Sequence, residues 1–179
     1  MSDELYFAFG SNLDINQMTR RCPSSQVVAK ATLPGYKLVF RGRSYTWGGA
    51  VASVDREPGR FTEGLVYQMS SSDLLRLDGF EGRAYARTMM TVHGRRRRRL
   101  RAWVYAMDPS VSAAAPSARY LATIQCAYAE LGFDQGALPE AHEDAPAAGG
   151  ELEECSIDEE LPDELSHDEI LKLTRRRFR

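Results

Sequence analysis

The sequence predicts an α+β domain built on a small, mixed, barrel-like β-sheet with flanking short helices. About six short runs of apolar and β-branched residues are separated by turn dipeptides, which is typical of strands joined by hairpins. Short segments with helical spacing interrupt these runs, as expected for an α+β domain. The chain has 179 residues, of which 43% are hydrophobic, and this content suffices for one core.

Local signals define the N-terminal elements. Residues 5–9 are a short apolar run that predicts a buried strand, and the Gly-Ser-Asn sequence at 10–12 predicts a tight loop after it. Asp14 is expected to cap a short helix that ends before Pro23.

The middle of the chain is expected to form four strands. The dipeptide Pro-Gly at 34–35 and the sequence Glu-Pro-Gly-Arg at 57–60 are typical of turns. The strands that these turns join are expected over residues 26–33, 36–41, 48–55 and 64–69.

A short helix and a last hairpin follow. The serines at 70–72 are expected to cap a helix that ends near Gly79. Strands over 85–93 and 100–107 are expected to flank an arginine-rich turn at 95–99. A solvated hairpin tip is the favoured interpretation of these arginines over a phosphate-binding surface, so nucleic acid is not an expected partner.

Ser117 is expected to open a longer helix, because apolar residues follow at helical spacing and Gly132 stands where a C-terminal cap belongs. The composition from 135 to 150 turns to Ala, Gly, Pro and acids, which is typical of a linker. We therefore predict a catalytic domain over residues 1–134 and an acidic C-terminal tail over 135–179, with a short terminal helix in the tail.

Charge is distributed unevenly along the chain. Residues 1–119 carry 18 Lys/Arg and 10 Asp/Glu, whereas residues 120–171 carry 15 Asp/Glu and no Lys/Arg. A tail of this charge either lies over the basic body and screens the mouth of the pocket, or serves only to keep the protein soluble. The sequence leaves both interpretations open.

The first stretch suited to chemistry is FAFGSNL, residues 7–13. A strand that ends in Gly-Ser-Asn before a helix exposes several backbone N–H groups at one point. Gly10 allows either a close approach of another group or a positive φ. The loop is thus suited to hold a carboxylate or a developing oxyanion, although an ordinary strand–turn–helix joint has the same pattern.

The second and third stretches contain one acid and one tyrosine. Glu81 stands between two glycines just past the expected helix, beside the aromatic residues Phe80 and Tyr85. Desolvation by aromatic groups raises the pKa of a carboxyl group and suits it to proton transfer, yet a lone glutamate also fits a surface acid beside an arginine. Tyr120 offers either a hydroxyl group to a pocket or a ring to the core.

The stretches YFAFGSNL, LDGFEG and APSARY resemble, in order and spacing, those of the γ-glutamylcyclotransferase family, over residues 5–131. The resemblance implies a γ-glutamylcyclotransferase-like (AIG2-like) fold, with Glu81 as the general acid/base and Tyr120 as a substrate-binding residue. The other substrate-binding residues that it implies are Tyr6, Phe7, Ala8, Phe9, Gly10, Ser11 and Asn12. The family usually has tyrosine where this chain has Phe9, so one hydroxyl group is missing, and its effect on substrate range stays open.

By this resemblance the chain is a cyclotransferase that releases 5-oxoproline and a free amine or amino acid from a small γ-glutamyl compound. The α-amine of the substrate attacks its own γ-carbonyl, so the enzyme holds a folded conformer and supplies no nucleophile. This chemistry requires no metal and no organic cofactor.

Two alternatives remain. In the first, the same chemistry removes a γ-glutamyl group from a larger metabolite or an isopeptide. In the second, the chain is a non-catalytic binding module that uses the arginine-rich hairpin. The sequence identifies neither the leaving amine nor the pathway, and a homodimer is compatible with it.

A cytoplasmic location is expected. The chain contains no apolar run long enough to cross a bilayer. Its first residues, MSDELYFAFGS, are acidic and lack the basic region and apolar core of a secretory signal.

Overall fold

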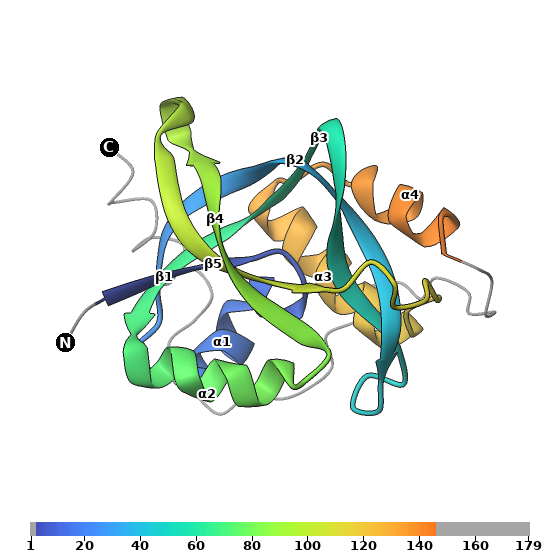
Figure 1. Ribbon diagram of the computed structural model, residues 1–179, viewed down its shortest axis with the longest axis horizontal. Coiled ribbons are helices and arrows are strands. Elements are labelled where there is room, and N and C mark those ends of the chain that lie inside the picture. Colours follow the sequence, from blue (N-terminus) through green and yellow to red (C-terminus); the bar gives the residue numbers. More distant parts are fainter. Residues whose placement is uncertain (1–2, 146–179) are drawn as a thin grey trace.

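The computed structural model describes residues 3–145, and their strands form a closed barrel in the order β1-β3-β2-β4-β5 (Figure 1). The barrel closes where β1 and β5 run parallel with Tyr6 opposite Trp103, while the other neighbouring strands are antiparallel. This arrangement confirms the predicted α+β, barrel-like fold. The strands are β1 (Asp3–Ala8), β2 (Gln26–Ser44), β3 (Gly49–Ser70), β4 (Tyr85–Gly94) and β5 (Arg99–Met107).

Strands β2 and β3 form one long ribbon where the sequence predicted four strands. The two expected turns lie opposite each other within the ribbon, since Pro34 pairs with Phe61 and the register shifts before Tyr36. Gly35 and Gly59 have φ of +77° and +88°, so each strand bends there without leaving the sheet. The turn residues therefore do change the direction of the chain, as predicted. They do so as a bulge that curves the ribbon into a barrel wall and not as hairpin turns.

Four helices of the described chain surround the barrel, and α1 and α2 lie side by side near β1 (Figure 1). The predicted caps are confirmed, because Asp14 accepts from the amides of Asn16 and Gln17, and Ser117 accepts from Tyr120. One boundary differs from the prediction, since α2 continues past Gly79. The helical segments are η1 (Ser11–Leu13), α1 (Ile15–Arg21), α2 (Ser71–Glu81), η2 (Arg95–Arg97), α3 (Ala118–Leu131) and α4 (Ala137–Glu143).

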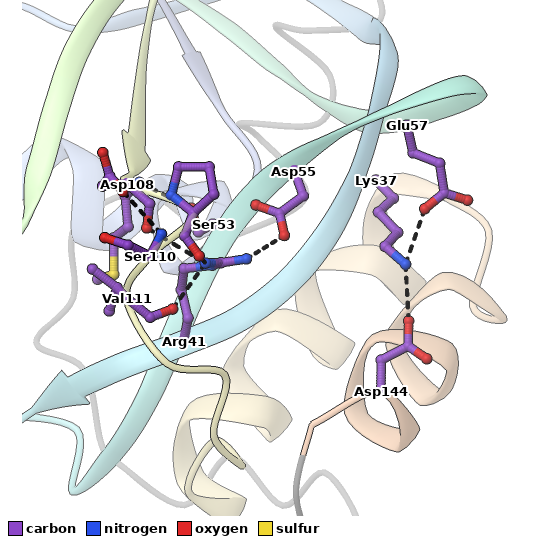
Figure 2. A network of polar contacts seen from close by, with 11 residues as sticks. Lys37, Arg41, Ser53, Asp55, Glu57, Asp108, Ser110, Val111 and Asp144 are labelled. Carbon is purple, nitrogen blue, oxygen red and sulfur yellow. Dashed lines mark hydrogen bonds and ion pairs between the residues drawn. The ribbon is translucent and has the colours of Figure 1, made fainter.

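Helix α4 lies in the stretch that composition predicted as a linker. Leu138 and Ala141 are buried in the core, and Asp144 just beyond the helix forms an ion pair with Lys37 of β2 at 3.2 Å (Figure 2). Two buried side chains fix this short helix, and so few positions give no periodic signal in the sequence. The remainder of the acidic tail, with its expected terminal helix, lies outside the described residues, so the domain boundary stays a prediction.

A buried arginine holds the chain that leads into α3. Arg41 of β2 forms an ion pair with Asp55 of β3 and donates Nη1 to the backbone carbonyls of Pro109 and Val111, at 2.7 and 2.8 Å (Figure 2). The acceptors around Nη1 and Nη2 offset the cost of burying this charge, while Nε has no hydrogen-bond partner among the described residues. The network fastens the segment after β5 to the ribbon and so helps to place the start of α3.

Candidate active site

The structure joins two of the predicted motifs through one hydrogen bond. Glu81 is the last residue of α2, and its Oε1 accepts from Nδ2 of Asn12 at 2.7 Å. Asn12 is buried in the turn after β1, with 5% of its surface exposed, and its Nδ2 also donates to Oη of Tyr6 at 2.9 Å. The acid and the Gly-Ser-Asn loop, 69 residues apart, therefore meet at one site.

Burial governs the electrostatics of Glu81. Desolvation raises the pKa of its carboxyl group, and the nearby charge of Asp78 adds to this effect. The positive charge of Arg21 and the hydrogen bond from Asn12 act in the opposite direction, but the pKa remains raised overall. A carboxyl group with a raised pKa exchanges protons nearer neutral pH, as a general acid/base requires.

Tyr120 packs against the same loop. Its hydroxyl group accepts from the amide of Ala52 at 3.0 Å and also hydrogen-bonds to Ser11. Burial raises the pKa of Tyr120 to about 12, so the phenol stays neutral at physiological pH. A Cβ atom at Gly10 would lie 3.1 Å from this hydroxyl oxygen, which shows how closely the loop and α3 approach.

The glycine at position 10 is explained by close packing and not by a positive φ. The sequence left two reasons for Gly10 open, and its φ of −108° excludes the positive φ. A Cβ atom at this position would lie 3.1 Å from Cβ of Ala52 as well as near Tyr120. Such contacts are tighter than ordinary van der Waals contact, so even alanine requires a shift of its neighbours.

One of the predicted residues, Phe7, faces away from Glu81. Side chains alternate along a strand, so Phe7 lies on the opposite face of β1 from Tyr6. The Phe7 ring packs over Gly64 and lies 6.2 Å from the Phe9 ring. A contribution of Phe7 to substrate binding would therefore come from its backbone. Ala8 is fully buried in the core, and its role stays a prediction as well.

Several polar groups near Glu81 were not singled out as site residues from the sequence. Tyr85 donates to the carbonyl of Ala52 at 2.7 Å, and Tyr67 donates to the carbonyl of Asn12 at 2.9 Å. Gln17 and Arg21 of α1 both contact the Asn12 side chain. Their spacing of four residues puts Gln17 and Arg21 on one helix face, but this spacing alone does not show that the face meets Asn12.

A groove of about 670 Å³ lies apart from this site. It is bordered by Lys30 of β2, by Arg60 and Phe61 of β3, and by Arg95 and Arg97 at the hairpin tip. None of the residues that surround Glu81 lines it. Within the described chain, no cluster of three or more His, Cys, Asp or Glu side chains is placed to hold a metal ion, and no helix has the length and apolarity of a membrane span.

We expect the arginines at 95–99 to be dispensable for chemistry at Glu81. Replacing all five with serine should leave kcat unchanged, because none of them is among the groups that shift the pKa of Glu81 or contact Asn12. Steady-state kinetics on the γ-glutamyl compounds that the sequence resemblance implies would check this result. A large loss of kcat with normal thermal unfolding would instead make the arginines ligands of the substrate carboxylate.

The fold and the site define a class: small barrels in which a partly buried glutamate meets a Gly-Ser-Asn loop among tyrosines. A sequence model of the family described as gamma-glutamyl cyclotransferase, AIG2-like, matches residues 6–122. The chain belongs to this family.

Individual relatives agree with this membership. Gamma-glutamylcyclotransferase of Homo sapiens is 40% identical over 82 residues, which are 44% of this chain and 44% of that protein, and the Bos taurus protein gives the same figures. The matched segment thus spans less than half of these relatives. A solved structure of a gamma-glutamyl cyclotransferase has a TM-score of 0.73 at 25% identity and covers 98% of this chain and 99% of that one. YkqA from Bacillus subtilis, at 22% identity and a TM-score of 0.64, shares the fold; 83% of this chain and 57% of that one are covered.

Proposed function

We propose that the protein is a γ-glutamyl cyclotransferase that releases 5-oxoproline and a free amine from a small γ-glutamyl compound. The observation that supports this most directly is the hydrogen bond from Asn12 to Glu81, because it places an acid with a raised pKa beside the Gly-Ser-Asn loop. Membership in the family and the curated relatives with this activity point in the same direction.

The reaction is an intramolecular acyl transfer. The Glu81 carboxylate takes a proton from the substrate's α-ammonium group, and the neutral amine attacks the γ-carbonyl carbon to close a five-membered ring. The bond between the γ-carbon and the leaving nitrogen then breaks as Glu81 returns a proton to that nitrogen. The ring nitrogen loses its second proton to the released amine, so the products are the neutral lactam and an ammonium group. The protein is neither oxidised nor acylated, so it must mainly hold the folded conformer and move protons.

The loop and the tyrosines are suited to the substrate's negative charges. We infer that backbone N–H groups at the start of the 3-10 turn would stabilise a carboxylate or a developing oxyanion. The backbone and the side chain of Ser11 hydrogen-bond to the Tyr120 hydroxyl group in this structure. Neutral phenols such as Tyr120 add hydrogen-bonding groups without a competing negative charge. The α-carboxylate and the γ-oxyanion are the two groups that this loop would serve.

A panel of γ-glutamyl compounds, assayed for 5-oxoproline by mass spectrometry, tests the proposal. Small γ-glutamyl amines and γ-glutamyl amino acids should yield 5-oxoproline and the free amine in equal amounts. The matched control is each compound with an N-acetylated α-amine, which cannot attack and should remain intact. Absence of 5-oxoproline from every member of the panel would contradict the proposed function.

The pH dependence follows from the environment of Glu81. Because burial raises its pKa, the carboxylate becomes protonated at a higher pH than the value of about 4.3 for an exposed glutamate. The carboxylate is the form that accepts the proton, so kcat/KM is expected to fall as the pH drops through this raised pKa. A kcat/KM profile that stays flat down to the ordinary glutamate pKa would contradict the role of Glu81 as base.

A further inference from the structure

Arg21, in the last turn of α1, contacts the residue that binds Glu81. Its Nη1 donates to Oδ1 of Asn12 at 2.8 Å, and Nε2 of Gln17, one turn earlier, donates to the same oxygen at 3.1 Å. A guanidinium group has donors and no acceptor. The amide oxygen of Asn12 must therefore face α1, and its NH₂ group must face Glu81 and Tyr6.

Resting on the proposed cyclotransferase function, we propose that Arg21 is a positioning residue that orients the Asn12 amide so that it donates to the Glu81 carboxylate. Without Arg21, the amide loses the charged donor that defines its orientation. A flipped amide would present Oδ1 to Glu81, and two acceptors would then oppose each other. Arg21 thus acts on the acid/base through Asn12 as well as by its own charge, and need not touch the substrate.

The guanidinium group is itself held in place from α2. Its Cζ lies 5.1 Å from the centre of the Phe80 ring, the residue next to Glu81. Stacking of this kind suits the planar guanidinium group better than a lysine ammonium. Phe80 is 53% exposed, so its ring is placed to cover the arginine rather than to fill the core.

The charges that face Glu81 fix the direction of the expected effect. Arg21 is the positive group and Asp78 the negative group that act on this carboxyl group, while Tyr6 and Tyr85 are neutral phenols affected by it. Removal of Arg21 takes away a charge that favours the carboxylate, and weakens the hydrogen bond from Asn12 that favours it too. The pKa of Glu81 should therefore rise further.

The test compares Arg21→Met with Arg20→Met, which removes the same charge from the same helical turn. Arg20 is exposed, and no contact between it and Asn12 is seen within residues 3–145. For Arg21→Met, the acid limb of the kcat/KM profile should move up by about one pH unit, as expected for an opposite charge lost a few ångströms away. For Arg20→Met the limb should stay in place. For Arg21→Lys, which retains a charged donor, the limb should stay close to its wild-type position.

A second readout does not depend on turnover. Titration of the Glu81 carboxyl carbon by ¹³C NMR should show the same upward shift in Arg21→Met and none in Arg20→Met. If the Arg21→Met protein does not fold, the same titrations are made on Arg21→Gln, because glutamine removes the charge and keeps a donor group. A purely structural role for Arg21 would lower thermal stability and leave both titrations unmoved.

Two negative results have different meanings. If the wild-type protein releases no 5-oxoproline but the NMR titration shifts, the proposed function fails and the positioning role stands. If the wild-type protein is active and the titration of Arg21→Met is unshifted, or if Arg20→Met shifts equally, the positioning role is overturned.

Discussion

Glu81→Gln is expected to lower kcat by about 10²–10⁴-fold, the range for loss of one acid/base group. The side-chain amide of the introduced glutamine keeps an oxygen that can accept from Asn12. The 2.7 Å contact that holds the loop is therefore expected to remain. Proton transfer is lost because the amide does not ionise. Rates of 5-oxoproline formation give kcat, and calorimetric titration with an unreactive substrate analogue should show nearly unchanged affinity.

The stability of this variant separates loss of chemistry from loss of fold. The pKa of Glu81 is higher in the folded protein than in the unfolded chain, so this group contributes stability below the unfolded pKa and loses it as the pH rises through the folded value. At neutral pH the ionised Glu81 therefore lowers the free energy of unfolding. The Glu81→Gln protein should unfold at the same temperature as the wild type or at a higher one. A variant that is folded and keeps wild-type kcat would refute the acid/base role.

Asp78→Asn is the matched control for Glu81→Gln. Asp78 lies one turn earlier on α2, where it accepts from Tyr105 at 2.7 Å and forms an ion pair with Arg87 at 3.1 Å. Its loss should reduce activity much less, because its carboxylate is occupied by these partners. Equal losses in the two variants would mean that the site requires both of these acids of α2 and would not single out Glu81.

The parts of the fold that were predicted correctly depend on neighbours in sequence. The cap at Asp14, the start of α3 at Ser117 and its end at Gly132 each need only a few adjacent residues, and the structure confirms all three. The ribbon of β2 and β3 shows where prediction from neighbouring residues fails. Pro34-Gly35 satisfies the local requirements of a turn, but pairing across the whole of β2 and β3 converts it into a bulge.

In the candidate site, too, local patterns were predicted correctly and contacts between distant elements were not. The sequence indicated Glu81 and the Gly-Ser-Asn loop separately, and resemblance to a family was needed to combine them. Arg21 was not found, because an arginine in a short helix has the pattern of a solvated residue. Its contact with Asn12 depends on how α1 packs against η1, and its contact with Phe80 on how α1 packs against α2. Such contacts between elements leave no local pattern.

Gly10→Val is expected to lower kcat/KM by about 10²-fold or more, because a displacement of reacting groups by about 1 Å has an effect of this size. The Cβ atom alone would lie 3.1 Å from both the Tyr120 hydroxyl oxygen and Cβ of Ala52, and valine adds two methyl groups. The loop must then move away from α3. That movement carries Asn12 with it, two residues along the chain, and so disturbs its hydrogen bond to Glu81.

Graded variants show whether space at Gly10 is the cause. Gly10→Ala should give a smaller loss than Gly10→Val, and Ala52→Gly combined with Gly10→Ala should recover part of it by removing one of the two close contacts. Gly79→Ala is the control, since a Cβ atom there meets nothing within 4 Å and should leave kinetics unchanged. A folded Gly10→Val protein with wild-type kcat/KM would show that the loop does not hold the glutamyl group, because the close packing between Gly10 and Tyr120 would then have no consequence for the reaction.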